Sequence, residues 1–390
     1  MRVVEVSSFV ASPLAGMTLA QLGADVIRVD PIGGAGDRNR WPVTDKGVSL
    51  YWKGLNKGKR SITVDMRSPE GQRLIQRLIT ESGPRGGIVL SNVVGRSWLE
   101  PDELERLRPD LIHLQITGRP DGGTAVDYTV NASMGIPLLT GPVDHNGPVN
   151  NMLPAWDIAC GLYAALGIVT ADQARATTGR GQRITLALHD VALTMVGHLG
   201  MLAEAELLAQ PRERIGNHVF GQFSRDFRCR DGEHVMVVVL TKRHWRDLTE
   251  VAGIRAAVEA LQTSLGANFD DEGERYRHRD TLAALLVPWF ATRELAEVSA
   301  TLERTSVMWS AYRTVKQAVA DNRDNPVLSV IDQPEVGPYL AAGSALRLQG
   351  LEQQIKPAPS LGGDSADVLG SWLGLAGDEI DGLRQRQVIG

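Results

Sequence analysis

Short β-rich runs alternate with helical segments through the first half of the chain, and this alternation most constrains the fold. Apolar and β-branched residues gather in runs that predict strands at 2–7, 25–30, 61–65, 87–91 and 111–117. Helical spacing or helix-start signals follow at 13–22, from Ser68-Pro69-Glu70 and near Pro101-Asp102. Strands and helices that alternate at these lengths predict an α/β fold, with a parallel sheet covered by helices on both faces.

A long apolar helix is predicted from about Asp157 to Thr177, with Gly179 as its stop. Its apolar stripe is predicted to contain Ile158, Leu162, Ala165, Leu166 and Val169.

The sequence changes character near residue 215. Two β-rich runs flank Asp231-Gly232, which is typical of a hairpin, and short helices follow. We therefore predict three parts: a large domain at 1–214, a small α+β domain at 215–310 and a C-terminal segment at 311–390 that returns to the large domain.

Composition narrows the class of protein. The 390 residues carry 41 basic and 46 acidic side chains, a net charge of −5, so nucleic acid and anionic membranes are not expected partners. The two cysteines cannot form a zinc site and suggest a reducing compartment. No signal-peptide pattern and no run of about 18 apolar residues occurs, so we expect a soluble cytoplasmic protein.

The common cofactor and catalytic motifs are missing. The first predicted strand is followed by SSFVASPLAG, which lacks the G-x-G-x-x-G of a nicotinamide or flavin site. P-loop spacing, H-E-x-x-H, G-x-S-x-G and C-x-x-C are also absent. We expect neither a metal nor a nicotinamide cofactor.

Asp157 is the most informative single residue, because it stands where the chain enters the long apolar helix. One interpretation is a plain helix N-cap. The other is a nucleophile: the positive end of the helix is expected to favour the ionised carboxylate, which can attack a thioester.

Two further features each have a structural and a functional interpretation. Lys57, Lys59, Arg60 and Arg67 surround a predicted strand and form either a solvated face or a phosphate-binding cluster. The loop with Gly216, Gly221 and Gln222 is either a domain connection or a mobile cover over the active site.

The chain resembles the class III (CaiB–BaiF) CoA-transferases over nearly its whole length. Three ordered blocks carry the resemblance: VVEVSSFVASPLAGMTLAQLGADVIRVDPIGGAGD, NKGKRSITVDMRSPEGQ, and DIACGLYAALGIVTA followed by TGRGQRITLALHD. The resemblance implies a Rossmann-like large domain built from both chain ends, a small α+β domain and an interlocked homodimer.

The same resemblance implies roles for individual residues. Asp157 falls on the catalytic aspartate and Asp127 on a second active-site acid. Directly after the acid of the second strand, where family members usually carry a basic residue that contacts CoA, this chain has Pro31. The other CoA-contacting positions fall on Phe9, Val10, Val64, Arg67, Asn92 and Arg96.

The resemblance implies an acyl-CoA substrate and leaves several reactions open. Additional segments, including RWPVTDKGVSLYWKGLNKGKRS and DGGTAVDYTVN, are most similar to family members that move CoA between two carboxyl groups of one dicarboxylic acid. Intermolecular transfer to a free acid is the alternative. Family racemases use a histidine just before the Asp127 position, where this chain has Val126. A non-catalytic CoA-binding protein is the alternative from another class.

Overall fold

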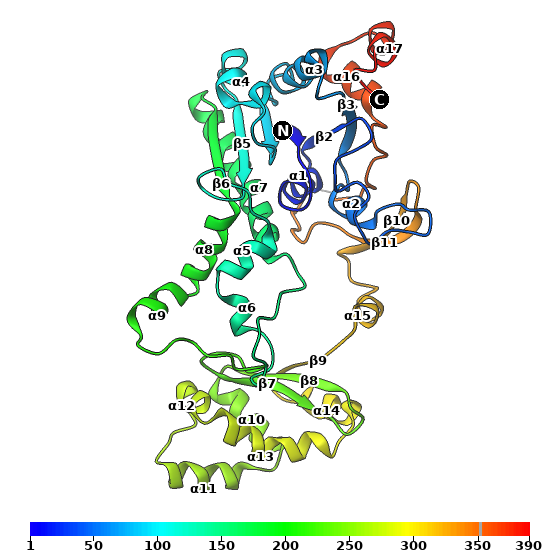
Figure 1. Cartoon of the computed structure of the whole chain (residues 1–390). Coiled ribbons are helices and arrows are strands. Elements are labelled where there is room, and N and C mark those ends of the chain that lie inside the picture. The colour runs from blue at the N-terminus through cyan, green and yellow to red at the C-terminus, as the bar shows by residue number, and fades with distance from the viewer. Residues whose placement is uncertain (351–352) are drawn as a thin grey trace. The chain divides into compact units, whose positions relative to one another are not determined.

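The computed structural model describes residues 1–350 and 353–390, and its main element is a six-stranded parallel sheet (Figure 1). The strand order is β3-β2-β1-β4-β5-β6. The sheet confirms the predicted parallel α/β architecture and adds an edge strand, β6, that the sequence did not predict. The strands are β1 (Arg2–Val6), β2 (Asp25–Pro31), β3 (Arg60–Val64), β4 (Ile88–Ser91), β5 (Ile112–Thr117) and β6 (Gln182–Ala187).

Helices cover both faces of this sheet, each over its own apolar core. On one face, side chains of β1, β2 and β3 pack with α3 (Pro69–Thr80), α4 (Pro101–Leu107), α16 (Ser365–Leu373) and α17 (Gly377–Gln385). On the other, α1 (Ala11–Gln21), α7 (Ala155–Thr178) and α8 (Leu188–His198) pack against the sheet. Ser68 caps α3 as its sequence indicates, since its hydroxyl accepts the N–H of Gly71 at 3.0 Å.

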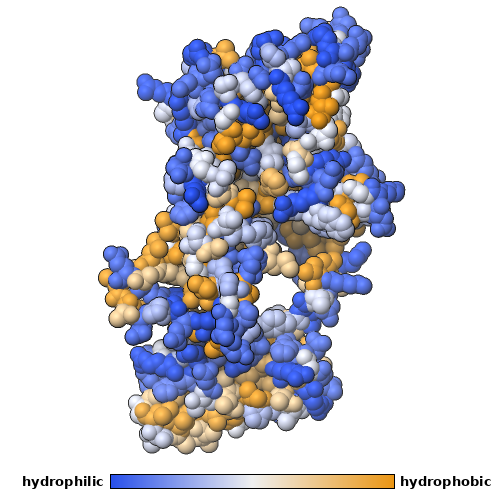
Figure 2. All heavy atoms as spheres, viewed as in Figure 1, coloured by the Kyte–Doolittle hydropathy of each residue, from blue (hydrophilic) through white to orange (hydrophobic). Residues whose placement is uncertain are grey.

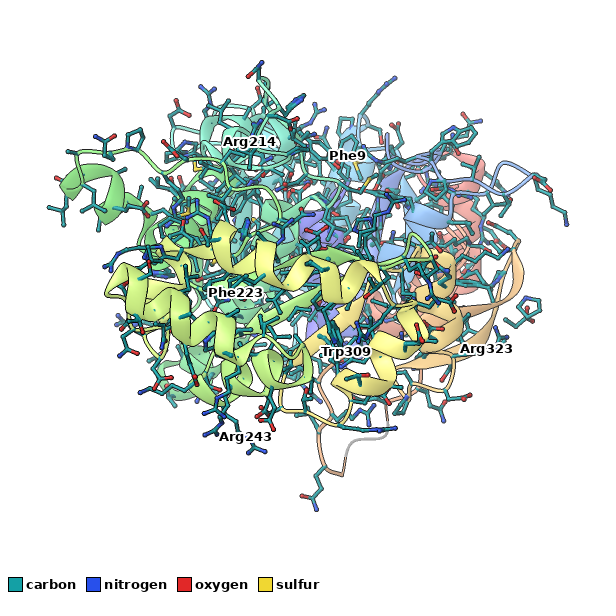
Figure 3. All side chains as sticks on the ribbon, turned by 90° about the horizontal axis from the view of Figure 1, so that it is seen from below. Phe9, Arg214, Phe223, Arg243, Trp309 and Arg323 are labelled. Atoms are coloured by element: carbon teal, nitrogen blue, oxygen red, sulfur yellow. The ribbon has the colours of Figure 1, made fainter. Side chains whose placement is uncertain are left out.

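The chain forms two compact units, and their boundaries differ from the predicted ones. The first comprises 1–134, 151–209 and 324–390, and the second comprises 135–150 and 210–323. Residues 135–150, which include α6 (Ile136–Leu139), join the second unit because Arg214 (labelled in Figure 3) donates hydrogen bonds to the carbonyls of Pro137, Leu138 and Gly147.

The second unit is built on an antiparallel sheet in the order β7-β8-β9. The strands β7 (Phe223–Arg228) and β8 (His234–Val239) form the predicted hairpin, and β9 (Met308–Ala311) pairs with β8. Besides α6, the helices of this unit are α10 (Lys242–Val251), α11 (Arg255–Leu265), α12 (Glu272–Arg277), α13 (Arg279–Ala291), α14 (Leu295–Leu302) and α15 (Val315–Asp321).

Smaller elements complete the first unit. They are α2 (Leu50–Leu55), the short 3₁₀ turn η1 (Ser97–Leu99), α5 (Asp127–Ser133), α9 (Met201–Leu207) and a hairpin of β10 (Leu328–Gln333) and β11 (Gly337–Ala342).

Most of the predicted apolar stripe of α7 does not face the core of this chain: Ala165 is buried, but Leu162, Leu166 and Val169 are exposed. Small residues make up most of the buried side, including Cys160, Gly161 and Ala164, whereas Leu162 and Leu166 are 51% and 61% exposed. Small side chains let α7 approach α1 closely, and the large apolar ones are left outside. Exposed apolar residues continue onto α8 and α9, and Figure 2 shows apolar side chains gathered where these helices lie in Figure 1.

Candidate active site

The strand order reverses between β1 and β4, and the loops after these two strands meet there. In open α/β sheets, ligands bind at such a switch point, beyond the carboxyl ends of the strands. The side chain of Asn92, just after β4, accepts the N–H of Ser8 at 3.1 Å and donates to the Ser8 carbonyl at 2.8 Å. Asn92 therefore fixes the loop that carries Phe9 and Val10.

Phe9 has an unusual backbone conformation in this loop. Its φ is +68°, which a side chain with a Cβ rarely adopts. The N–H of Phe9 donates to Asp37 Oδ2 at 3.0 Å, and Arg28 donates to both oxygens of Asp37. The conformation is thus maintained by a buried ion pair, and the ring (labelled in Figure 3) is 45% exposed.

A buried polar network lies beneath the loop. Arg28 also pairs with Asp30 at 2.9 Å, and Lys59 pairs with Glu5 at 2.8 Å. A Cβ at Gly16 would lie 1.8 Å from a Glu5 oxygen, so α1 needs glycine at this position. Arg28 and Asp30 occupy the polar positions of β2, which are buried because helices cover both faces of the sheet.

Asp157 lies in the first turn of α7, but it does not cap the helix. The N–H groups of Trp156 and Asp157 both donate to Asp127 Oδ2, at 2.8 and 3.0 Å. Asp127, at the start of α5, therefore occupies the positive end of α7. The carboxylate of Asp157 accepts no hydrogen bond from the residues that the structure describes, which contradicts the N-cap interpretation.

Burial and the charge of Asp127 raise the pKa of Asp157 from 3.8 to about 7. The prediction that the helix end favours the ionised form is therefore wrong. Burial likewise raises the pKa of Asp127, although its two backbone hydrogen bonds oppose the shift. An unpartnered carboxyl group that titrates near neutrality is typical of a functional site.

Close packing places Asp157 beside the switch point. At Gly161, one turn along α7, an added Cβ would lie 2.7 Å from the Ala11 carbonyl oxygen. Because α1 begins at Ala11, directly after Phe9 and Val10, this contact brings the first turn of α7 to the loop that Asn92 fixes. Asp157, Phe9 and Asn92 are thus brought to one edge of the sheet.

Two residues of this region were missed at the sequence level, Arg40 and Tyr51. The Arg40 guanidinium carbon lies 5.6 Å from the centre of the Phe9 ring and 5.0 Å from that of Tyr51. The positive charge of Arg40 lowers the pKa of Asp157, and the charge of Asp157 raises that of Tyr51. No motif marks either residue, although both lie in the block RWPVTDKGVSLYWKGLNKGKRS.

The remaining expected CoA contacts fall into two groups. Val10 and Val64 are buried near the carboxyl ends of β1 and β3, and Arg67 and Arg96 are exposed after β3 and β4. All four lie toward the edge of the sheet that carries the switch point.

The basic cluster of the sequence is not one surface. The Lys59 ammonium is buried on Glu5, and burial lowers its pKa to about 8. Arg60, at the opposite end of β3, pairs with Asp25 and Asp367. Burial lowers the pKa of Lys57. Of these four cations, Arg67 alone is exposed after the carboxyl end of the strand.

The glycine loop lies in the second unit. Gly216 and Gly221 have φ values of +64° and +82°, which explains glycine at both positions. Between them, the ring of Phe220 packs at a tilt of 58° against that of Tyr276, with ring centres 5.3 Å apart, and Gln222 directly precedes β7. This contact anchors the loop to α12.

Neither a metal cluster nor the cavity beside β2 and β3 coincides with Asp157. No group of three metal-ligating side chains occurs in 1–350 or 353–390. A cavity of about 710 Å³ opens at the amino-terminal side of β2 and β3, among Asp25, Arg60 and Lys356. It lies at the sheet edge opposite to the switch point.

Three comparisons place the chain among known proteins. A family model described as CoA-transferase family III matches residues 1–365. A 2-methylfumaryl-CoA isomerase from Chloroflexus aurantiacus is 49% identical over 395 aligned positions, which cover 100% of this chain and 97% of the relative. A succinyl-CoA–D-citramalate CoA-transferase from the same organism is 26% identical, with the same two coverages of 100% and 97%. The crystal structure of a CaiB/BaiF family protein from Brucella suis superposes with a TM-score of 0.79 at 26% identity, covering 95% of this chain and 98% of that one.

Proposed function

The chain belongs to CoA-transferase family III, and we propose that it moves CoA between the C1 and C4 carboxyl groups of one 2-methylfumarate (mesaconate) molecule. The full-length similarity to a 2-methylfumaryl-CoA isomerase supports this choice of substrate. The observation that carries the chemistry is Asp157, whose carboxylate lacks a partner in the described residues because Asp127 caps the helix.

The proposed reaction proceeds through Asp157 in four transfers. The Asp157 carboxylate attacks the thioester carbonyl, which expels CoA thiolate and leaves a mixed anhydride. The thiolate attacks the aspartyl carbonyl, releases the dicarboxylate and leaves an aspartyl-CoA thioester. The other carboxylate of the acid then attacks this thioester, and the expelled thiolate attacks the acyl carbonyl of the new anhydride. Asp157 is regenerated, and the reaction needs no metal or redox cofactor.

The raised pKa of Asp157 suits this role. A carboxylate whose conjugate acid titrates near pH 7 is more basic than a free aspartate, and nucleophilicity rises with basicity. Asp127 takes part by keeping the helix N–H groups away from Asp157.

We propose that CoA occupies the edge of the sheet around the switch point. The residues assigned to it are Phe9, Val10, Val64, Arg67, Asn92 and Arg96. Lys59 and Arg60 are expected to support CoA binding only indirectly. The charge of Lys59 already pairs with Glu5, and that of Arg60 pairs with Asp25 and Asp367. The loop with Gly216, Gly221 and Gln222 remains the proposed cover of the active site.

We further propose that two copies interlock as a homodimer in the cytoplasm. In the described part of the chain, one helix, α7, is long and apolar enough to cross a membrane by length and composition. The apolar side chains responsible face outward and continue onto α8. A second copy of the chain covering this face would explain why Leu162, Leu166, Val169, Leu193 and Leu199 are exposed in a single chain.

The proposal is tested by product analysis with the C1 thioester of 2-methylfumarate and ¹³C-labelled free acid. We expect the C4 thioester to form without label, since the substrate's own carboxylate is the acceptor. Label in the product, or a rate that depends on added succinate, would instead establish intermolecular transfer.

The variant Asp157→Ala should abolish this conversion while the protein remains folded. Asp102 offers a matched control, because it is also an acid in the first turn of a helix, α4, but is exposed on the surface. Asp102→Ala should retain activity.

A further inference from the structure

We propose that Arg40 and Tyr51 form a subsite that binds the free carboxylate of a dicarboxylic acyl group while the other carboxyl group reacts at Asp157. The inference rests on the proposed function and names the part of the site that selects the substrate class. It depends on the positions of the Arg40 guanidinium, the rings of Phe9 and Tyr51, and the Tyr51 hydroxyl, which has no hydrogen-bond partner among the described residues.

Arg40 is an exposed cation whose charge acts on Asp157. It forms no ion pair with the residues that the structure describes, in contrast to the nearby Arg28, which is buried on Asp30 and Asp37. Its guanidinium lies over the rings of Phe9 and Tyr51, which leaves the edge of the guanidinium available for an oxygen ligand.

The main chain fixes the position of Arg40 at two points. The N–H of Arg40 donates to the Asp37 carbonyl at 3.1 Å, and the Arg40 carbonyl accepts the hydroxyl of Ser49. Ser49 also caps α2, the helix that carries Tyr51, through the N–H of Trp52 at 3.0 Å. Ser49 therefore fixes the backbone at Arg40 relative to the start of the helix that carries Tyr51.

Tyr51 supplies the second observation. Its hydroxyl oxygen is enclosed and has no hydrogen-bond partner in the part of the chain that the structure describes. A buried hydroxyl without a partner is costly, and a substrate oxygen would satisfy it. The pKa of Tyr51 is raised to about 12 by burial and by Asp157 among other charges, so the phenol remains a hydrogen-bond donor.

The negative charges near Asp157 also require a cation at this place. A dicarboxylic acyl group brings a negative charge next to Asp157 and Asp127, and without a cation the three charges would repel one another. A guanidinium binds a carboxylate through two parallel hydrogen bonds. Because the subsite recognises a carboxylate alone, either end of the acid can occupy it in turn, as transfer between the two ends requires.

The test compares succinyl-CoA with butyryl-CoA, which have four-carbon acyl chains and differ in the terminal carboxylate. Binding is measured by calorimetry in an Asp157→Asn background, where succinyl-CoA cannot acylate the protein. Adding Arg40→Gln should weaken succinyl-CoA binding by about 10- to 100-fold, the range for a lost charge-assisted hydrogen bond, and butyryl-CoA binding by less than about twofold. Arg40→Lys should retain part of the preference, and Tyr51→Phe should lose less of it than Arg40→Gln.

The control is Arg106→Gln, which removes an exposed arginine on α4 that pairs with Glu103. It should change neither affinity. Equal losses for both ligands in Arg40→Gln would overturn the subsite and make Arg40 a CoA contact. An unchanged preference would overturn it as well.

Different experimental results would refute the subsite and the proposed function. A protein that does not isomerise the 2-methylfumaryl thioester, yet loses its succinyl-CoA preference in Arg40→Gln, refutes the function and keeps the subsite. In an active enzyme, Arg40→Gln should also move the acid limb of the pH–rate profile to higher pH, because the charge that favours ionised Asp157 is gone. A purely structural role for Arg40 would not move this limb.

Discussion

At the scale of single residues, two acids divide the tasks at the start of α7. Asp127 binds the free N–H groups of the helix, and Asp157 is left with an unsatisfied carboxyl group in a poorly solvated position. The sequence identified Asp157 through its place at a helix start, but the division of tasks depends on α5 lying against α7. That contact joins residues about 30 positions apart, and no local pattern encodes it.

The first prediction concerns the pH dependence of the rate. Since the nucleophile is the ionised form of Asp157, kcat/KM should fall as the pH decreases through about 7. Asp127→Asn removes the negative charge that raises this pKa but keeps an oxygen for the helix N–H groups. The acid limb of its pH–rate profile should therefore move to lower pH, and a limb that stays in place would contradict the assigned coupling.

The second prediction concerns stability. A folded-state pKa of about 7 against an ordinary 3.8 means that ionising Asp157 destabilises the fold progressively from about pH 4 to 7. Asp157→Asn should therefore raise the Tm at pH 8 by roughly 2 °C or more, the response of a large domain to about 1 kcal/mol. The gain should shrink toward pH 4, as measured by calorimetry across this range. A gain independent of pH would contradict the shifted pKa.

At the scale of elements, the position of α7 against α1 determines where Asp157 lies. The sequence predicted this helix and its ends closely, because Gly179 and the long apolar run are local signals. It assigned the wrong face, since the size of buried side chains depends on how near the partner helix comes. The edge strand β6 was missed although polar and apolar residues alternate along 183–186, because most of its residues are not fully buried and its only paired strand, β5, is distant in sequence.

The third prediction tests the contact between α1 and α7. Gly161→Ala would place a Cβ 2.7 Å from the Ala11 carbonyl oxygen, so the free energy of unfolding should fall by about 1–3 kcal/mol. Activity should fall too, because Asp157 is one turn away.

Gly167 on the same helix provides the control. A Cβ there would meet no atom closer than 3.5 Å, so Gly167→Ala should be neutral or stabilising by up to about 1 kcal/mol. Denaturant unfolding measures both variants, and equal effects would contradict the role of close packing.

At the scale of the whole molecule, local patterns indicated the parallel sheet, the hairpin in the second unit and a C-terminal segment that packs back on the large domain. They did not indicate that residues 135–150 belong with the second unit, because the Arg214 hydrogen bonds span about 70 positions. The buried ion pairs of β2 were likewise hidden, since alternating polar residues also suit a solvent-exposed strand.

The fourth prediction is that the protein is a stable homodimer. Light scattering should give about twice the 42.3 kDa of one chain. Leu166→Glu, on the exposed face of α7, should weaken the dimer, whereas Leu107→Glu on α4, at a position 60% exposed, should not. A fully active monomer would contradict the proposed assembly.

Covalent trapping shows directly whether Asp157 is the nucleophile. The protein is incubated with the 2-methylfumaryl thioester and hydroxylamine, which converts an aspartyl thioester or anhydride to a stable hydroxamate. Peptide mass spectrometry should find the hydroxamate on Asp157, only when substrate is present, and not on Asp127. Turnover without modification of Asp157, or modification of Asp127 in its place, would show that Asp157 is not the nucleophile.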